Sequence, residues 1–385
     1  MVVAFNFPPF NDGSAVTVAK RIIEVGERVD VISADLSRVR SVDPSLSELV
    51  HPLVNSIQHL SVPIKFADET SVRPFVTKGI SSLRSRARNP YTSVYSRSMW
   101  PHSHFLAAHT RTSGLALEWV AEFSDPILWH ADATPRPSSR VTLDNHSAKI
   151  LRSVGAQGQR LLQERDSILE WAQFVPFLLA DELVFTNSQQ QEIMIADAPL
   201  WARKSIQERS RISPHPTLPR PYYETGPEAL PQPSSDGFRI GYFGNFYPNR
   251  GGGEFLEALS TLDQDIRRRI HLDVYTSDAS PLLKAARSLK LESHVDTRPA
   301  LPFSAFLRTS DTYDALLVND IATSPFGIPS PFLPSKYSDY SGSSAPIMAI
   351  ALEGSPLDIR PAAFKARTGD IDSIRRMLVG AASSS

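Results

Sequence analysis

The first thirty residues show the pattern of a strand, a loop, a helix and a second strand, which limits the folds open to this chain. Residues 2–5 form an apolar run, and the loop after it contains prolines and Gly13. Apolar side chains then recur at helical spacing over residues 15–23, and Gly26 suits the end of that helix. Residues 29–33 read as the next strand. Repeated units of this kind build a parallel sheet, so the sequence predicts an α/β fold.

The rest of the first half shows fewer clear elements. Residues 119–123 and 183–186 read as buried strands, and a helix is expected after the second of them. Ser188 and Gln191 have the spacing of a capping box, which predicts Ser188 as the N-cap of that helix.

A proline-rich stretch, residues 213–235, separates the two halves, and the α/β rhythm restarts at residues 238–243. Further strands are expected near residues 272–275, 315–318 and 346–350, with helices between them and a final helix around residues 371–378. A chain of 385 residues is long enough for two cores. The sequence therefore predicts two Rossmann-like domains, residues 1–212 and 236–385, which face each other across a cleft and are joined by a linker at 213–235.

Composition excludes several classes of function. The net charge of −1 provides no global field for nucleic acid, and the absence of cysteine rules out disulfides and thiolate sites. No signal peptide and no membrane-spanning stretch is evident. We expect a cytoplasmic protein that reaches a membrane, if at all, from its inner surface. Arg84, Arg86 and Arg88, together with Leu83, are candidates for contact with anionic lipid, and a mobile basic loop is the alternative.

The loop of residues 244–253 follows a predicted strand and opens a predicted helix. Gly244 and Gly251 allow the backbone to approach a phosphate, and Arg250 can pair with one. This pattern is typical of a diphosphate site, and an ordinary glycine-rich turn is the alternative. Gly13 and Ser14 stand at the corresponding place in the first half, where a simple helix cap is equally compatible.

Lys336 and Asp339 lie three residues apart at the start of a predicted short helix, and therefore on one face of it. A carboxylate there can accept both hydroxyls of a ribose, and an ammonium group can neutralise phosphate. The two residues together predict a nucleotide-diphosphate site. A surface ion pair is the alternative.

Two of these segments resemble a known family. Residues 244–251 are similar to the donor-phosphate loop of the retaining GT-B glycosyltransferases of family four, and residues 334–340 resemble that family's Pro-Ser-Lys, aromatic, acidic and Tyr stretch. The resemblance extends to residues 344–349, 181–191 and 11–14. It implies a nucleotide-sugar-dependent glycosyltransferase with two Rossmann-like domains, acting in glycan or cell-surface polysaccharide synthesis.

The resemblance also implies roles for individual residues. Asp339 would hold the ribose, Arg250 and Lys336 would meet the donor diphosphate, and Gly13 would lie beside the sugar phosphate. The other nucleotide-sugar residues are Ser14, Gly244, Asn245, Gly251 and Ser335. On the acceptor side, Asp125 would stand near the reacting centre, which gives Asp125, Arg250 and Lys336 as the catalytic residues, and His130 is a weaker candidate.

The implied chemistry is transfer of a sugar from a nucleoside diphosphate to an acceptor hydroxyl of a glycan or lipid-linked molecule, with retention of configuration. The nucleotide sugar is a co-substrate, and no cofactor or metal is expected, since cations and helix N–H groups face the leaving diphosphate. His102, His104 and His109 are not expected to hold a metal.

Two positions depart from the family pattern. Asn245 stands where an arginine is usual, and Pro331 stands where the first of two glutamates is usual. These departures keep two alternatives open: a catalytically silent GT-B protein that binds a nucleotide, a glycan or a partner protein, and a nucleotide-sugar epimerase.

Overall fold

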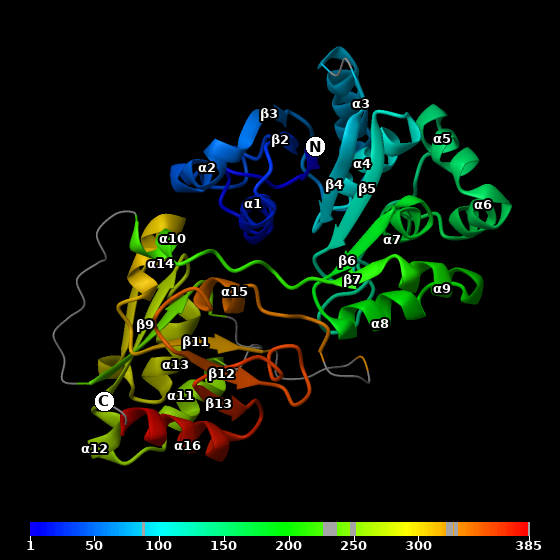
Figure 1. Cartoon of the computed structure of the whole chain (residues 1–385). Helices are drawn as coiled ribbons and strands as arrows, with labels where there is room; N and C mark the ends of the chain where they lie inside the picture. Colours follow the sequence, from blue (N-terminus) through cyan, green and yellow to red (C-terminus); the bar gives the residue numbers. More distant parts are fainter. Residues whose placement is uncertain (87–88, 226–236, 247–251, 321–325, 327–329, 384–385) are drawn as a thin grey trace. The chain divides into compact units, whose positions relative to one another are not determined.

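The computed structural model describes residues 1–86, 89–225, 237–246, 252–320, 326 and 330–383. The chain forms two compact units, Met1–Pro216 and Thr217–Ser385 (Figure 1). The division falls inside the stretch that we predicted as a linker, of which residues 226–236 lie outside the described part. Pro221–Glu224 in this stretch forms a short helix, α10, because a proline at the first position of a helix costs no hydrogen bond.

The first unit is built on a parallel sheet of seven strands in the order β3-β2-β1-β4-β5-β6-β7. Its strands are β1 (Val2–Val3), β2 (Val29–Ala34), β3 (Val54–Leu60), β4 (Tyr91–Ser98), β5 (Ala116–Phe123), β6 (Glu182–Phe185) and β7 (Ser210–Ile212). Successive strands run in the same direction, for example Val2 beside Tyr95 and Ala121 beside Leu183. All strands therefore end at one edge of the sheet.

Helices cover both faces of this sheet (Figure 1). Alternate residues of β1 face opposite sides: Val2 packs with Val18 and Ile22 of α1, whereas Val3 belongs to the larger core that contains Phe75. The helices are α1 (Gly13–Val25), α2 (Pro44–Val50), α3 (Glu69–Arg86), α4 (His102–Thr112), α5 (Asn145–Ser153), α6 (Gly155–Glu164), α7 (Ile168–Leu179), α8 (Ser188–Ala196) and α9 (Leu200–Glu208).

The second unit repeats the design with a parallel sheet of six strands in the order β10-β9-β8-β11-β12-β13. Its strands are β8 (Phe238–Phe243), β9 (Ile270–Thr276), β10 (Val295–Pro299), β11 (Ala315–Asn319), β12 (Ile347–Ala351) and β13 (Phe364–Arg367). Its helices, in addition to α10, are α11 (Gly252–Ser260), α12 (Gln264–Arg267), α13 (Ser280–Ser288), α14 (Phe303–Ser310), α15 (Lys336–Tyr340) and α16 (Ile371–Ala382). The two-domain Rossmann-like α/β class predicted from the sequence is confirmed.

Most elements predicted in the second unit are confirmed, including the final helix, whose Ile374, Met377 and Leu378 are buried. One detail of the first unit is wrong. The N-cap of α8 is Asn187, whose side chain accepts a hydrogen bond from the N–H of Gln190, and Ser188 is the first helical residue. Asparagine and serine are both good caps, so the capping-box spacing alone did not decide between them. No helix in the described part of the chain has the length and apolar character needed to cross a membrane.

Three histidines of α4 are buried in the core of the first unit. His102 contacts the ring of Phe5 at 4.0 Å between centroids, and His104 contacts Phe123 at 4.9 Å. Burial disfavours the charged imidazolium, and it lowers the pKa of His102, His104 and His109 to about 3 in each case. These side chains are therefore neutral parts of the core.

This burial predicts that acid destabilises the first unit. A histidine in the unfolded chain has a pKa of about 6.5, so below that pH the unfolded state binds protons that the folded state excludes. The stabilisation is complete above the unfolded pKa and is lost as the pH falls from about 6.5 toward 3. Between about pH 7.5 and 5.5 we expect each histidine to cost about 1.4 kcal/mol of unfolding free energy.

Urea unfolding followed by tryptophan fluorescence measures this effect, because all tryptophans of the chain lie in the first unit. His104→Gln should reduce the pH dependence over this range by about 1.4 kcal/mol, whereas His130→Gln, at an exposed position, should leave it unchanged. Equal stability at both pH values would contradict neutral, buried histidines.

Candidate functional site

The order of the strands places a topological switch point in the second unit. From β8 the chain proceeds to β9 and β10 on one side, and it then crosses to β11, β12 and β13 on the other. In an open parallel sheet, ligands bind at such a reversal, outside the carboxyl ends of the two central strands. Here those strands are β8 and β11. The loop after β8 begins at Gly244, and the segment after β11 leads to α15 (Figure 1).

Gly244 and Lys336, two of the predicted site residues, lie side by side at this switch point. Gly244 has φ 129°, and a Cβ atom there would lie 2.8 Å from Cε and 2.9 Å from Nζ of Lys336. The positive φ favours glycine at this position, and the end of the Lys336 side chain occupies the space beside it. Nζ of Lys336 is also 4.9 Å from the ring centroid of Tyr242, within the range of a cation–π contact. The structure thus holds a positive charge against the backbone at the end of β8.

Asn245 braces the loop after β8 against the end of β9. Its Oδ1 accepts hydrogen bonds from Oγ1 of Thr276 at 3.0 Å and from Oγ of Ser277 at 2.8 Å. The hydroxyl of Tyr242 donates to the carbonyl of Asn245 at 3.1 Å. Asn245 therefore has a structural role at the position where the resembling family usually carries an arginine.

Two tyrosines hold α15 in place beside the end of β8. Neither was assigned a role from the sequence. The buried hydroxyl of Tyr340 accepts a hydrogen bond from the N–H of Phe243 at 3.0 Å, which joins α15 to the last residue of β8. The hydroxyl of Tyr223 donates to the carbonyl of Asp339. Burial raises the pKa of the Tyr340 hydroxyl well above its usual value, so it stays protonated. For Tyr340 a sequence signal was available, because it is the final Tyr of the stretch that resembles the known family.

The remaining predicted residues of the second unit are placed as follows. Asp339 is partly buried and lies one helical turn after Lys336 on α15, as the spacing predicted. Ser335 is exposed just before α15, and its carbonyl accepts from Oγ of Ser338 at 2.8 Å. Arg250 and Gly251 lie outside the described residues.

In the first unit, Gly13 and Ser14 begin α1 at the carboxyl edge of the sheet. Asp12 is the N-cap, and its Oδ1 accepts from the N–H of Ser14 at 2.8 Å. A Cβ atom at Gly13 would have no neighbour within 4 Å, so the fold does not require glycine there. The hydroxyl of Ser14 accepts a hydrogen bond from Nη1 of Arg97, at the end of β4, at 2.7 Å. Arg97 thus places a positively charged guanidinium group beside Ser14.

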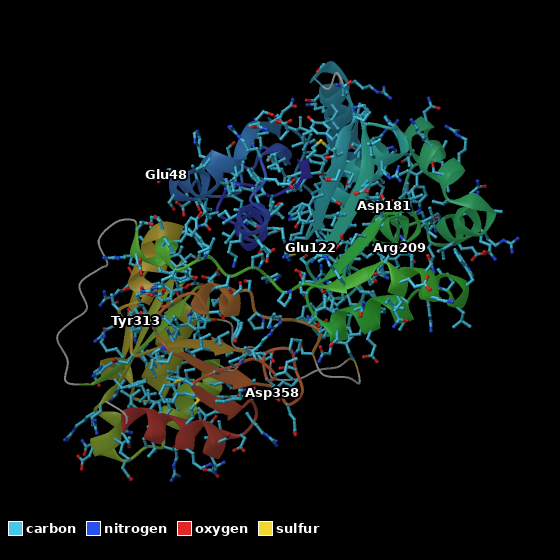
Figure 2. The ribbon with its side chains drawn as sticks, in the orientation of Figure 1. Glu48, Glu122, Asp181, Arg209, Tyr313 and Asp358 are labelled. Atoms are coloured by element: carbon cyan, nitrogen blue, oxygen red, sulfur yellow. The ribbon has the colours of Figure 1, made fainter. Side chains whose placement is uncertain are left out.

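A buried carboxylate, Glu122 on β5, holds Arg97 in place (Figure 2). Its Oε1 lies 3.1 Å from Nε of Arg97, and its Oε2 lies 3.0 Å from Nε of Arg21. The hydroxyl of Tyr95 donates to Oε2 at 3.0 Å. The side chains of Glu122, Arg97 and Arg21 are 1%, 3% and 6% exposed, so this is a desolvated network. This network was not predicted from the sequence, although the charged residues inside buried strands pointed to it.

Asp125 lies on the loop after β5, at the same carboxyl edge as Ser14, and is partly buried. The hydroxyl of the preceding Ser124 donates to the carbonyl of Ser98 at 2.7 Å, which ties this loop to the end of β4. His130 is exposed further along the loop. The structure thus gathers Gly13, Ser14 and Asp125 at one edge of the first sheet.

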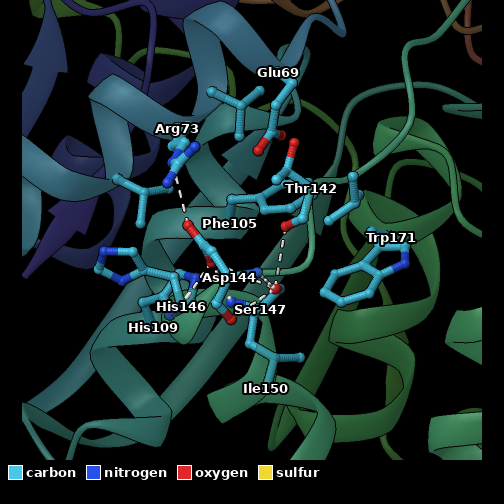
Figure 3. A pocket seen from close by; sticks show the side chains of 13 residues that line it. Glu69, Arg73, Phe105, His109, Thr142, Asp144, His146, Ser147, Ile150 and Trp171 are labelled. Carbon is cyan, nitrogen blue, oxygen red and sulfur yellow. Dashed lines mark hydrogen bonds and ion pairs between the residues drawn. The ribbon is translucent and has the colours of Figure 1, made fainter.

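A different pocket lies among α3, α4, α5 and α7 of the first unit (Figure 3). Its polar side chains are paired with one another: Asp144 accepts from the N–H groups of His146 and Ser147 and lies 3.2 Å from Nε of Arg73. Burial raises the pKa of the Glu69 carboxyl in this pocket. None of the predicted site residues lines it. Across the ranges that the structure describes, no three His, Asp or Glu side chains form a group suited to a metal ion.

Comparison with known proteins gives matches in structure alone. No protein-family model and no curated protein sequence matches the chain. The solved structure of Anabaena HepE in complex with UDP and glucose has 11% sequence identity and a TM-score of 0.62, covering 98% of this chain and 89% of that one. The catalytic domain of starch synthase IV from Arabidopsis thaliana, bound to ADP and acarbose, has 10% identity and a TM-score of 0.60, covering 100% and 91%. A putative UDP-N-acetylglucosamine 2-epimerase from Listeria monocytogenes has 9% identity and a TM-score of 0.55, covering 99% and 87%.

These matches extend over nearly the whole chain and include both units, at identities that establish the fold and not the activity. The chain therefore has the GT-B fold, with two Rossmann-like domains.

Proposed function

We propose that the protein is a glycosyltransferase that moves a sugar from a nucleoside-diphosphate sugar to a hydroxyl of a glycan or lipid-linked acceptor, in glycan or cell-surface polysaccharide synthesis. The observation that carries the proposal is the contact of Lys336 with Gly244 at the switch point of the second sheet. A cation held at that place fits a diphosphate. Structural neighbours crystallised with UDP or ADP support the same assignment.

In the proposed reaction the bond between the anomeric carbon and the diphosphate oxygen breaks, the acceptor oxygen forms the new bond to that carbon, and the proton of the acceptor hydroxyl passes to the leaving diphosphate. Negative charge grows on the leaving diphosphate, and Lys336, together with Arg250, would stabilise it. Asp339 would accept hydrogen bonds from the ribose hydroxyls. Gly13 and Ser14 would lie beside the sugar phosphate, and Asp125 near the reacting carbon.

The proposal extends to the stereochemistry, the need for a metal and the location of the reaction. Retention of configuration rests on the resemblance to retaining enzymes. Catalysis without a metal follows from the cations assigned to the leaving diphosphate. Action in the cytoplasm, with peripheral membrane contact where the acceptor is lipid-linked, follows from the type of donor and acceptor.

An assay with a panel of UDP-, GDP- and dTDP-sugars tests the activity. We expect one donor to release its nucleoside diphosphate faster in the presence of cell-extract glycans or glycolipids, with the sugar recovered on the acceptor. Nucleotide binding without turnover would indicate a catalytically silent GT-B protein, the alternative suggested by Pro331 at the position of the family's first glutamate. Recovery of an isomerised nucleotide sugar would show an epimerase.

Asp339→Ala should weaken nucleotide binding by about 1–3 kcal/mol, because the carboxylate that would accept hydrogen bonds from the ribose hydroxyls is lost. Calorimetric titration with the matching nucleoside diphosphate measures the loss. Asp265→Ala is the control, since the Asp265 side chain is 96% exposed in the same unit. Unchanged affinity in folded Asp339→Ala protein would remove Asp339 from the site.

A further inference from the structure

Tyr223 is a buried residue of α10, the short helix in the stretch that was predicted as a linker. Its hydroxyl donates a hydrogen bond to the carbonyl of Asp339 on α15. Burial, together with the nearby carboxylates of Asp339 and Asp311, raises the pKa of this hydroxyl, which therefore stays protonated and acts as the donor. A residue of α10 thus reaches the residue to which the ribose is assigned.

Helix α15 depends on contacts of this kind for its place in the unit. It has five residues, and isolated helices shorter than about 12–15 residues are marginal in water. The last carbonyls of a helix also lack partners within the helix. The hydroxyl of Tyr223 supplies such a partner to the carbonyl of Asp339, and the hydroxyl of Tyr337 donates to the carbonyl of Pro361 at 2.9 Å. The orientation of α15 is therefore set by tertiary contacts, and that of Tyr223 is made to Asp339 itself.

Tyr223 is in turn held on several sides. The guanidinium group of Arg220 lies 6.0 Å from the centroid of its ring, and Nη1 of Arg220 donates to Oδ1 of Asp311 at 2.9 Å. The same carboxylate oxygen accepts from Oγ of Ser343 at 2.7 Å, which ties the turn after α15 to the end of α14. Gly342 leaves room for the ring, since a Cβ atom there would lie 2.5 Å from both Cζ and Oη of Tyr223. The hydroxyl of Tyr223 therefore has a fixed place at the end of α15.

We propose that Tyr223 is a positioning residue for the ribose of the donor: it holds the end of α15 so that the carboxylate of Asp339 accepts hydrogen bonds from the ribose hydroxyls. The inference rests on the proposed function, which places the nucleotide at the ends of β8 and β11. It adds to the nucleotide site a residue 116 positions away from Asp339 in the sequence. A purely structural role would lower stability or weaken every nucleotide equally, whereas a positioning role changes what the ribose hydroxyls contribute to binding.

The test is calorimetric titration of the full chain with UDP, GDP, ADP and dTDP, each compared with its 2′,3′-dideoxy form. Wild type should bind one nucleoside diphosphate at least about tenfold more tightly than its dideoxy form, because hydrogen bonds to a carboxylate are lost with the hydroxyls. Tyr223→Phe keeps the ring and removes its hydroxyl, so this ratio should fall below about threefold through weaker binding of the hydroxylated form. Tyr222→Phe, the same exchange at the neighbouring, partly exposed position, is the matched control and should keep the wild-type ratio.

Gly342→Ala is a second variant, which displaces the ring of Tyr223 without changing its hydroxyl. The ratio should fall here too, and this variant decides the question if Tyr223→Phe does not fold. A wild-type ratio in folded variant protein, or equal weakening of the hydroxylated and dideoxy forms, overturns the inference. Equal binding of both forms by wild type also overturns it and leaves the nucleotide site in place. Absence of binding of every nucleotide to wild type refutes the proposed function, and the inference with it.

Discussion

Lys336→Met should lower the turnover of the nucleotide sugar by about a hundredfold to a thousandfold, the usual effect of removing one group that stabilises developing negative charge. The reason is local: Nζ of Lys336 lies at the backbone of Gly244, where the proposed leaving diphosphate sits. Methionine keeps the apolar stem beside Tyr242 and removes only the charge. The fold should therefore be preserved.

Steady-state kinetics of nucleoside diphosphate release measure this effect. The loss should fall mainly on kcat, since the charge grows in the transition state. Lys284→Met, on the exposed surface of α13, is the matched control and should behave as wild type. A fall in stability with unchanged kcat would instead give Lys336 a purely structural role.

Glu122→Ala should destabilise the first unit by about 3–5 kcal/mol, because it leaves the buried guanidinium group of Arg97 without its carboxylate and leaves Arg21 with only the half-exposed Glu24. Glu122→Gln keeps the volume and an acceptor oxygen, so its cost should be smaller. Arg97 would also lose the support that directs it to Ser14, and turnover should fall in any protein that remains folded.

Urea unfolding followed by tryptophan fluorescence gives the change in the first unit alone. Glu48→Ala serves as the control, since Glu48 is exposed on α2 of the same unit. A loss no larger than that of Glu48→Ala would contradict the desolvated network.

Local patterns made much of the second unit predictable from the sequence. β8, β9, β11 and β12 are short apolar runs, and the helices between them have clear apolar faces. The contact between Gly244 and Lys336 could be anticipated because glycine-rich loops and short polar helices at strand ends are local features, and the strand order then brings them together.

The first unit was less predictable because its interior is more polar. β4 carries Arg97, β5 carries Glu122, and α4 carries buried histidines, and all of these obscure the apolar period. Glu122 pairs with Arg21, a residue that is distant in the sequence.

The most direct test of the nucleotide site is a crystal structure of the protein soaked with a mixture of UDP-sugar and GDP-sugar. The account predicts one nucleoside diphosphate at the carboxyl ends of β8 and β11, with a phosphate oxygen about 2.7–2.9 Å from Nζ of Lys336 and the ribose beside Asp339. A nucleotide that binds elsewhere and makes no contact with Lys336 or Gly244 would contradict this nucleotide site.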